Sequence, residues 1–274
     1  MKSFKIIFSL TVVLITVFSC NKTTKSQTKP ENFEPNVAFA ELEKDFMKWW
    51  TYQSNTISLS SDFEGFDVEF NKIDKKLFLE KLTTGNFIPL RLSPLNGIEQ
   101  YKLFKLGVHA DERIGTTIKN TSLTTLQYYK LEGIRFPEFD FTDLNGTNYT
   151  SESIKGKTTV FKTWFINCKA CIAEFPELNA FVESHKDFNF VSLALDSEAE
   201  LNKFLASKTF KYETVANQKQ LIQGTLGLQT YPTHIVVDEN GFILKVVNNA
   251  TEMISFLELS HKSIETAPPP PAPM

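Results

Sequence analysis

Apolar runs alternate with amphipathic segments along the second half of the chain. Two runs, KTTVFKTWFI at 157–166 and FNFVSLALD at 188–196, are rich in β-branched and aromatic residues, which predicts buried strands. The segment after the first run, 169–186, has helical spacing, and the second run precedes a helical pattern in which Ser197 and Glu200 fit a capping box. This alternation predicts an α/β sandwich around a mixed sheet.

Turn residues complete the pattern of this half. The segment 138–150 is a predicted hairpin that turns at Asn145-Gly146, and 233–247 is a predicted antiparallel hairpin that turns at residues 239–241. The remaining predicted elements are a short strand at 212–216 and helices at 219–226 and 251–264. A mixed sheet that ends in an antiparallel hairpin is therefore expected.

The stretch 38–132 has a mixed pattern and contains no group of residues with recognisable chemistry. The predicted elements are helices at 39–50, 74–82 (with Asp74 as the N-cap) and 112–133, and strands within 61–70 and at 87–93. The pair Trp49 and Trp50 is interpreted as core, with a surface for partner docking as the alternative. A smaller mixed α+β domain is expected here, with boundaries at 37–132.

The first residues have the pattern of a secretory signal peptide at 1–19. Lys2 and Lys5 precede an apolar run, 6–18, which is short for a bilayer span. Ser19 before Cys20 resembles the lipobox of bacterial lipoproteins, although valine stands where leucine is commonest. We expect Cys20 to carry a lipid. A plain signal peptide with an incidental cysteine, or a short anchor helix, is the alternative.

Flexible segments are expected at both ends of the mature chain. Residues 20–36 are polar and are predicted to form a lipid-anchored tether. The proline-rich residues 265–274 are predicted to be a disordered tail.

Composition and charge narrow the possible partners. The chain has 274 residues, 42% of them apolar, which is ample for a large core. A formal net charge of −3 gives no indication of a nucleic-acid partner. The chain has 3 cysteines. If Cys20 is lipidated, Cys168 and Cys171 are left to pair, and no further cysteine remains for a structural zinc site.

The two paired cysteines lie between the predicted strand 157–166 and the helix 169–186. The unpaired N–H groups at a helix start favour a nearby anion, and the thiolate of Cys168 is the reactive form of the thiol. Cys171 lies one turn further on, close enough to form a disulfide with Cys168. This pattern predicts a redox-active dithiol. A stapling disulfide would close too short a loop to stabilise much, and copper binding with His234 remains an alternative.

Residues 133–259 resemble the TlpA/ResA-type family, which are membrane-anchored thiol–disulfide oxidoreductases with a thioredoxin fold. The resemblance rests on FPEFDFTDLNGTNYTSESIKGKTTVFKTWF, on CKACIAEFPELN and on YPTHIVVDENG. It implies a thioredoxin-like domain at 133–264, in which helices flank a central mixed sheet. The smaller α+β domain at 37–132 lies outside the resemblance.

The family pattern also implies roles for particular residues. Cys168 and Cys171 are the catalytic pair. Tyr231 and a cis Pro232 would receive a substrate strand, and Trp164 matches the tryptophan of this family near the end of the first buried strand. These three residues are the predicted substrate-binding residues.

Charged residues near the pair carry further predictions. Glu174 lies three residues after Cys171 on the same helical face, where a carboxylate could exchange a proton with that thiol. Lys162 stands where thioredoxins have a buried acid, and we expect it to pair with Glu174 because an unpaired buried ammonium is costly. A solvated edge position is the alternative for Lys162. The chain also departs from the family at Asn167 and Ala170, where the family usually has tryptophan and proline.

The leading hypothesis is a thiol–disulfide oxidoreductase that reduces disulfides of envelope proteins; the reductive direction is implied by the resemblance. Its partners would be disulfide-containing clients and a membrane thiol donor, with no cofactor or metal beyond the cysteine pair. The expected location is the periplasm-facing envelope, on a lipid anchor. The alternatives are a peroxiredoxin-like thiol peroxidase, which would need threonine where Phe165 stands, and a copper-binding or scaffold lipoprotein.

Overall fold

The computed structural model describes residues 37–92 and 98–265, and side chains up to residue 260. All of these residues belong to one compact unit. The predicted signal peptide, Cys20 with its tether, and residues 266–274 of the predicted tail lie outside the described residues.

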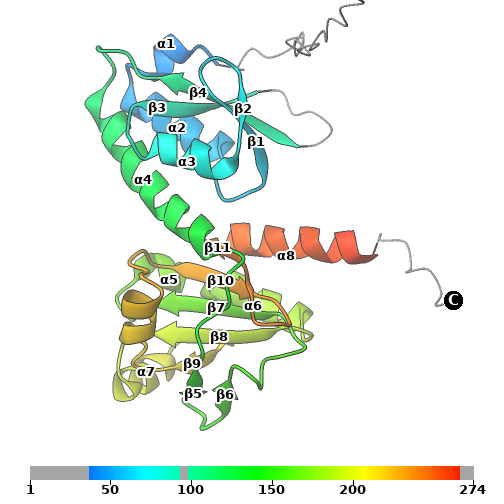
Figure 1. The fold of residues 1–274 in the computed structure, drawn as a ribbon. Helices are drawn as coiled ribbons and strands as arrows, with labels where there is room; N and C mark the ends of the chain where they lie inside the picture. The colour runs from blue at the N-terminus through cyan, green and yellow to red at the C-terminus, as the bar shows by residue number, and fades with distance from the viewer. Residues whose placement is uncertain (1–36, 93–97, 266–274) are drawn as a thin grey trace, which may run out of the picture. The chain divides into compact units, whose positions relative to one another are not determined.

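A five-stranded sheet forms the centre of the second half of the chain (Figure 1). The strand order is β11-β10-β7-β8-β9, with β7 (Thr159–Trp164), β8 (Asn189–Ala194) and β9 (Glu213–Val215) running parallel. β10 (Thr233–Val237) pairs antiparallel with both β7 and β11 (Ile243–Val247). All six residues of β7 are buried, as the apolar run predicts. The predicted mixed sheet of a thioredoxin fold is confirmed.

Helices cover this sheet, and two of the predicted helices, 169–186 and 219–226, differ from prediction. The elements are the hairpin β5 (Asp140–Thr142) and β6 (Asn148–Thr150), helices α5 (Lys169–Ala173), α6 (Phe175–Ser184), α7 (Glu198–Leu205) and α8 (Ala250–Glu265), and a π-helix at Gln220–Thr225. The predicted helix 169–186 is divided at Glu174, because Pro176 near the start of α6 has no N–H to continue the α5 ladder. The capping box of Ser197 and Glu200 is present.

The first half of the chain contains a separate four-stranded sheet of order β2-β1-β4-β3. Its elements are α1 (Phe39–Leu42), α2 (Phe46–Thr56), β1 (Phe63–Phe66), β2 (Lys72–Ile73), α3 (Lys75–Leu82), β3 (Phe87–Arg91), β4 (Glu99–Lys105) and α4 (Glu112–Leu131). The predicted N-cap of α3 is confirmed, since the Asp74 carboxylate accepts the Leu77 N–H. Of the tryptophan pair, Trp49 is buried as predicted, whereas Trp50 is 40% exposed. We propose that this sheet and its helices form the α+β domain at 37–132.

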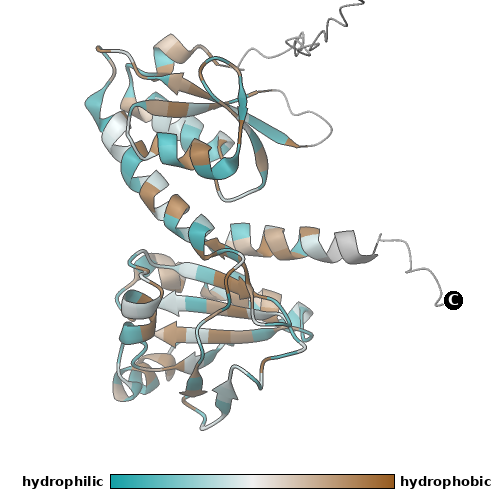
Figure 2. Cartoon of the chain, in the orientation of Figure 1, coloured by the Kyte–Doolittle hydropathy of each residue, from teal (hydrophilic) through white to brown (hydrophobic). Residues whose placement is uncertain are grey.

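The alternation of side chains along β7 divides the core of the second half. Phe161 packs with Ile235 on one face of the sheet, whereas Val160 and Val236 pack on the other face with residues of α6 and α8. Figure 2 shows the apolar stretches along these central strands. Lys162 alternates with Val160, so its charge enters the face that α6 and α8 cover. A lysine in that position needs a partner.

Candidate active site around a buried disulfide

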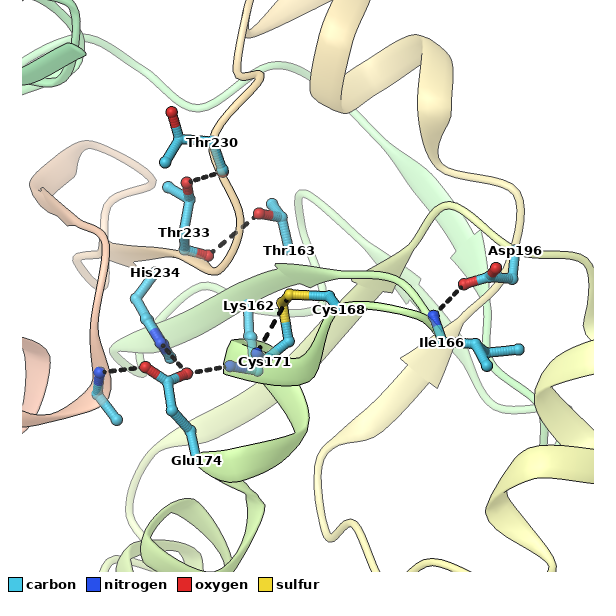
Figure 3. Close-up of a disulfide and its surroundings, with 11 residues drawn as sticks. Lys162, Thr163, Ile166, Cys168, Cys171, Glu174, Asp196, Thr230, Thr233 and His234 are labelled. Atoms are coloured by element: carbon cyan, nitrogen blue, oxygen red, sulfur yellow. Dashed lines mark hydrogen bonds and ion pairs between the residues drawn. A yellow bond between two sulfur atoms is a disulfide. The ribbon is translucent and has the colours of Figure 1, made fainter. Parts of the chain in front are cut away.

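Cys168 and Cys171 form a disulfide at the start of α5, with their Cα atoms 5.2 Å apart (Figure 3). Cys168 is the N-cap residue of α5, and its sulfur accepts the N–H of Cys171 at 3.1 Å. Cys168 is 7% exposed and Cys171 is 0% exposed. The first cysteine is therefore the one that an incoming sulfur atom can reach.

Backbone contacts fix the loop that leads from β7 into α5. The N–H of Ile166 donates to Oδ2 of Asp196, which follows β8, at 2.8 Å. The N–H of Cys168 donates to the Phe165 carbonyl at 3.0 Å. Because β7 and β8 are neighbouring parallel strands, Ile166 and Asp196 both lie just beyond the carboxyl ends of these strands. The sheet therefore determines where the first cysteine lies.

Glu174 lies between α5 and α6 and accepts hydrogen bonds from three partners (Figure 3). Its Oε2 accepts from Nζ of Lys162 and, at 3.0 Å, from Nε2 of His234. Its Oε1 accepts the N–H of Ala250, the first residue of α8, at 2.8 Å. The predicted ion pair between Lys162 and Glu174 is thus confirmed, and His234 is an addition to it.

Burial and charge shift the pKa values of these three groups in definite directions. Burial alone would raise the pKa of Glu174, but the hydrogen bonds and charges of its partners outweigh it and lower this pKa to about 2. Burial lowers the pKa of Lys162, with partial compensation by Glu174. Burial also lowers the pKa of His234 to about 4, so this imidazole is neutral near pH 7. The carboxylate therefore stays ionised through Lys162 and through two neutral N–H donors.

This geometry argues against one predicted role of Glu174. A carboxyl group with a pKa of about 2 is a weak base near neutral pH. Its oxygens also accept hydrogen bonds from three donors. The carboxylate is therefore better suited to balance the charge of Lys162 and to fix the positions of its partners than to exchange a proton with Cys171.

His234 does not lie near a loop rim, where the copper alternative would need it. Its side chain is fully buried on β10, opposite Lys162 on β7. Among the residues that the structure describes, no group of three or more His, Cys, Asp or Glu side chains could hold a metal ion. The structure gives the copper alternative no support.

The peptide bond between Tyr231 and Pro232 is cis, as the family resemblance implies. The Tyr231 ring packs edge-on against Phe165 with centroids 5.4 Å apart, and its hydroxyl accepts Nε2–H of Gln223 at 3.1 Å. Tyr231 and Phe165 both pack against the cluster that contains the two cysteines. An aromatic rim thus lies beside the disulfide.

Trp164 does not belong to this rim, which corrects the prediction that it binds substrate. Its side chain is fully buried and packs against the rings of Phe175, Phe204 and Phe210. Trp164 alternates with Lys162 and Val160 along β7, so its side chain lies on the same face of the sheet as theirs, the face that α6 and α8 cover. Trp164 is a core residue that packs beneath the site.

A Cys-x-x-Cys disulfide at the start of a helix, beside a cis-proline loop on a mixed sheet, defines a thioredoxin-like protein. Such a pair can exchange with other disulfides through a mixed disulfide. The site therefore has the arrangement of a thiol–disulfide oxidoreductase.

Comparisons with known proteins narrow this class. Residues 133–246 match the AhpC/TSA family. A thiol-disulfide oxidoreductase ResA of Bacillus thuringiensis is 27% identical over 118 residues, which is 42% of this chain and 68% of the relative. A ResA of Bacillus cereus is 27% identical over 124 residues, which is 44% of this chain and 72% of the relative. Over these residues the chain is similar to ResA/TlpA-type thioredoxin-like proteins, and it is a thiol–disulfide oxidoreductase.

A solved structure of a thiol:disulfide interchange protein DsbE from Chlorobium tepidum is also similar. It is 23% identical, with a TM-score of 0.43, and the match covers 48% of this chain and 96% of the other.

Proposed function

We propose that the protein reduces disulfides of cell-envelope proteins, with Cys168 as the nucleophile and Cys171 as the resolving cysteine. The difference in exposure between the two cysteines carries this assignment, because Cys168 is 7% exposed and Cys171 is 0% exposed. A client sulfur can approach Cys168 beside the rim of Phe165 and Tyr231, whereas Cys171 can reach only its neighbour.

The proposed reaction has two exchange steps. The Cys168 thiolate attacks one sulfur of the client disulfide, and the other client sulfur leaves as a thiolate that takes a proton from water. Cys171 then loses its proton to water and attacks Sγ of Cys168, which releases the second client thiolate. The client gains two electrons and the cysteine pair loses them, so a membrane thiol donor is needed to restore the dithiol.

Substrate contact is proposed for the cis-proline loop. The backbone of Tyr231, next to Pro232, would pair with an extended client segment as a sheet edge does. The side chain of Tyr231 is held by Phe165 and by Gln223. This fixed ring would contact the client residue next to the attacked cysteine.

The envelope location is proposed from the sequence. The signal peptide pattern at 1–19 and the lipobox resemblance at Cys20 support secretion and lipid anchoring towards the periplasm. No helix in the described part of the chain has both the length and the apolar character of a membrane span.

Catalysed reduction of insulin disulfides tests the function, with hydrogen peroxide consumption measured on the same preparation. We expect dithiothreitol-driven insulin reduction well above the uncatalysed rate, and peroxide consumption no faster than that of a free thiol. The match to the AhpC/TSA family makes the peroxide measurement necessary. Rapid peroxide turnover without insulin reduction would refute the proposal in favour of a peroxidase.

Trapping identifies the clients. A Cys171→Ser variant should retain its client in a mixed disulfide through Cys168, because the resolving step is lost. The matched Cys168→Ser variant should trap nothing at this site. Equal trapping by both variants would contradict the assignment of the nucleophile.

A further inference from the structure

Two neighbouring strands deliver His234 and Lys162 to the same carboxylate. The two residues are register partners on β10 and β7, so their side chains lie on the same face of the sheet. Both side chains are fully buried. Both contact Oε2 of Glu174, as Figure 3 shows. We call Lys162, Glu174 and His234 the buried triad.

The contacts of His234 fix its protonation. Its Nε2 faces a carboxylate oxygen, which can only accept, so Nε2 carries the proton. Its Nδ1 is buried and has no hydrogen-bond partner among the residues that the structure describes. An imidazolium would place an N–H there without an acceptor, which is costly. His234 is therefore the neutral tautomer with a proton on Nε2.

The buried triad then holds one positive and one negative charge. Lys162 provides an ammonium and Glu174 a carboxylate, and both His234 and Ala250 bind that carboxylate through neutral N–H groups. Tyr212 is also buried close enough for the charge of Glu174 to act on it, and it stays a neutral phenol because burial raises its pKa well above 10.

The Glu174 carboxylate, with Lys162 bound to it, belongs to a residue one helical turn after the resolving cysteine. Cys171 precedes Glu174 by three residues, and Glu174 keeps right-handed helical backbone angles as the C-cap of α5. Residues three apart on a helix have Cβ atoms about 5–6 Å apart. Cys171 is fully buried, so its thiolate depends on nearby charges and dipoles for stabilisation.

We infer that His234 is a positioning residue for Cys171: its Nε2–H holds the Glu174 carboxylate against Lys162, and the fixed pair stabilises the Cys171 thiolate that resolves the mixed disulfide. The inference rests on the proposed function for its purpose. Without the His234 donor, the carboxylate charge is less well neutralised and the potential at Cys171 becomes more negative. The thiolate should then be harder to form.

The test is the pKa of Cys171 in the reduced full-length protein, followed through the ¹³Cβ chemical shift of that cysteine. A His234→Leu variant should raise this pKa by about half a unit to one unit, which leaves roughly three- to tenfold less thiolate at pH 7. The His234→Gln variant keeps an N–H at a similar reach and should stay close to the wild type. A purely structural role of the imidazole would not separate the two variants in this way.

A Lys162→Met variant should raise the pKa of Cys171 more than His234→Leu does, because it removes the cation itself. An unchanged Cys171 pKa in either His234→Leu or Lys162→Met would overturn the inference. If these variants do not fold, ¹⁵N spectra of His234 in the wild type decide: the Nε2–H tautomer at pH 7 supports the inference, and the Nδ1–H tautomer or an imidazolium overturns it.

The proposed function can fail independently of this inference. The Cys171 titration needs no client and no turnover. If the Cys171 pKa shifts as expected in the variants but the protein does not reduce insulin, the positioning role of His234 is supported and the proposed function is refuted.

Discussion

Replacement of Glu174 by glutamine tests the energetics of the buried triad. Glutamine resembles the protonated carboxyl group in size and charge, so Glu174→Gln measures what ionisation of Glu174 contributes. The ordinary pKa of 4.5 falls to about 2 in the folded protein. A difference of about 2.5 pKa units corresponds to roughly 3 kcal/mol of unfolding free energy at pH 7.

An independent consideration gives a similar magnitude. Removal of one partner of a buried ion pair typically costs about 3–5 kcal/mol. The Glu174 side chain retains 14% exposure while Lys162 has none. Some solvent screening therefore reaches the pair, and the lower end of that range, about 3 kcal/mol, is expected.

The sign of the pH dependence follows from the direction of the shift. Because the folded-state pKa of Glu174 is depressed, the stabilisation is present above pH 4.5 and is lost as the pH falls towards 2. Glu174→Gln and the wild type should therefore differ most near pH 7 and converge near pH 2.

Urea unfolding of the oxidised protein at several pH values is the assay, because urea does not screen charges. The matched control is Glu183→Gln on α6, whose carboxylate pairs with Lys186 and Lys211 at the surface and should matter little. A loss below about 1 kcal/mol at pH 7 for Glu174→Gln, or a loss that persists at pH 2, would refute the reasoning.

Three further predictions concern His234, Trp164 and Tyr231. Wild-type stability should fall as the pH drops from 6.5 to about 4, because the unfolded chain binds a proton at His234 first; pH-dependent urea unfolding of His234→Gln should lack this decline. Trp164→Ala should cost about 3–5 kcal/mol of unfolding free energy, and a loss of insulin reduction without a loss of stability would contradict its core position. Tyr231→Ala should raise the KM for insulin severalfold while Tyr231→Phe stays near the wild type; equal effects would place the role in the hydroxyl and not in the ring.

Strong local signals made the second half of the fold predictable. The runs at β7 and β8 are long and apolar, and the capping box starts α7 where Ser197 predicts it. The helix predicted at 169–186 is divided into α5 and α6, with Pro176 at the start of α6. By contrast, the segment 220–225 is a π-helix, which no residue pattern distinguishes from an α-helix.

The candidate site was predictable where sequence spacing fixes geometry. Cys168, Cys171 and Glu174 share one helical segment, so their proximity follows from their spacing. The place of His234 depends on strand register, because a shift by one residue would turn its side chain to the other face. His234 lies two residues after Pro232 and two before Val236. This spacing was the sequence signal for the face that its side chain takes. Trp164 was misassigned because a motif match does not show that the rings of Phe175, Phe204 and Phe210 cover its side chain.

Alkylation of the reduced wild-type protein tests the central claim most directly. Iodoacetamide labelling across pH, with each cysteine peptide resolved by mass spectrometry, gives the reactivity of Cys168 itself. We expect Cys168 to react well before Cys171 and to titrate below the ordinary thiol pKa of about 8.5. A Cys168 that stays unmodified near neutral pH, or that titrates at or above that value, would rule out its role as the nucleophile.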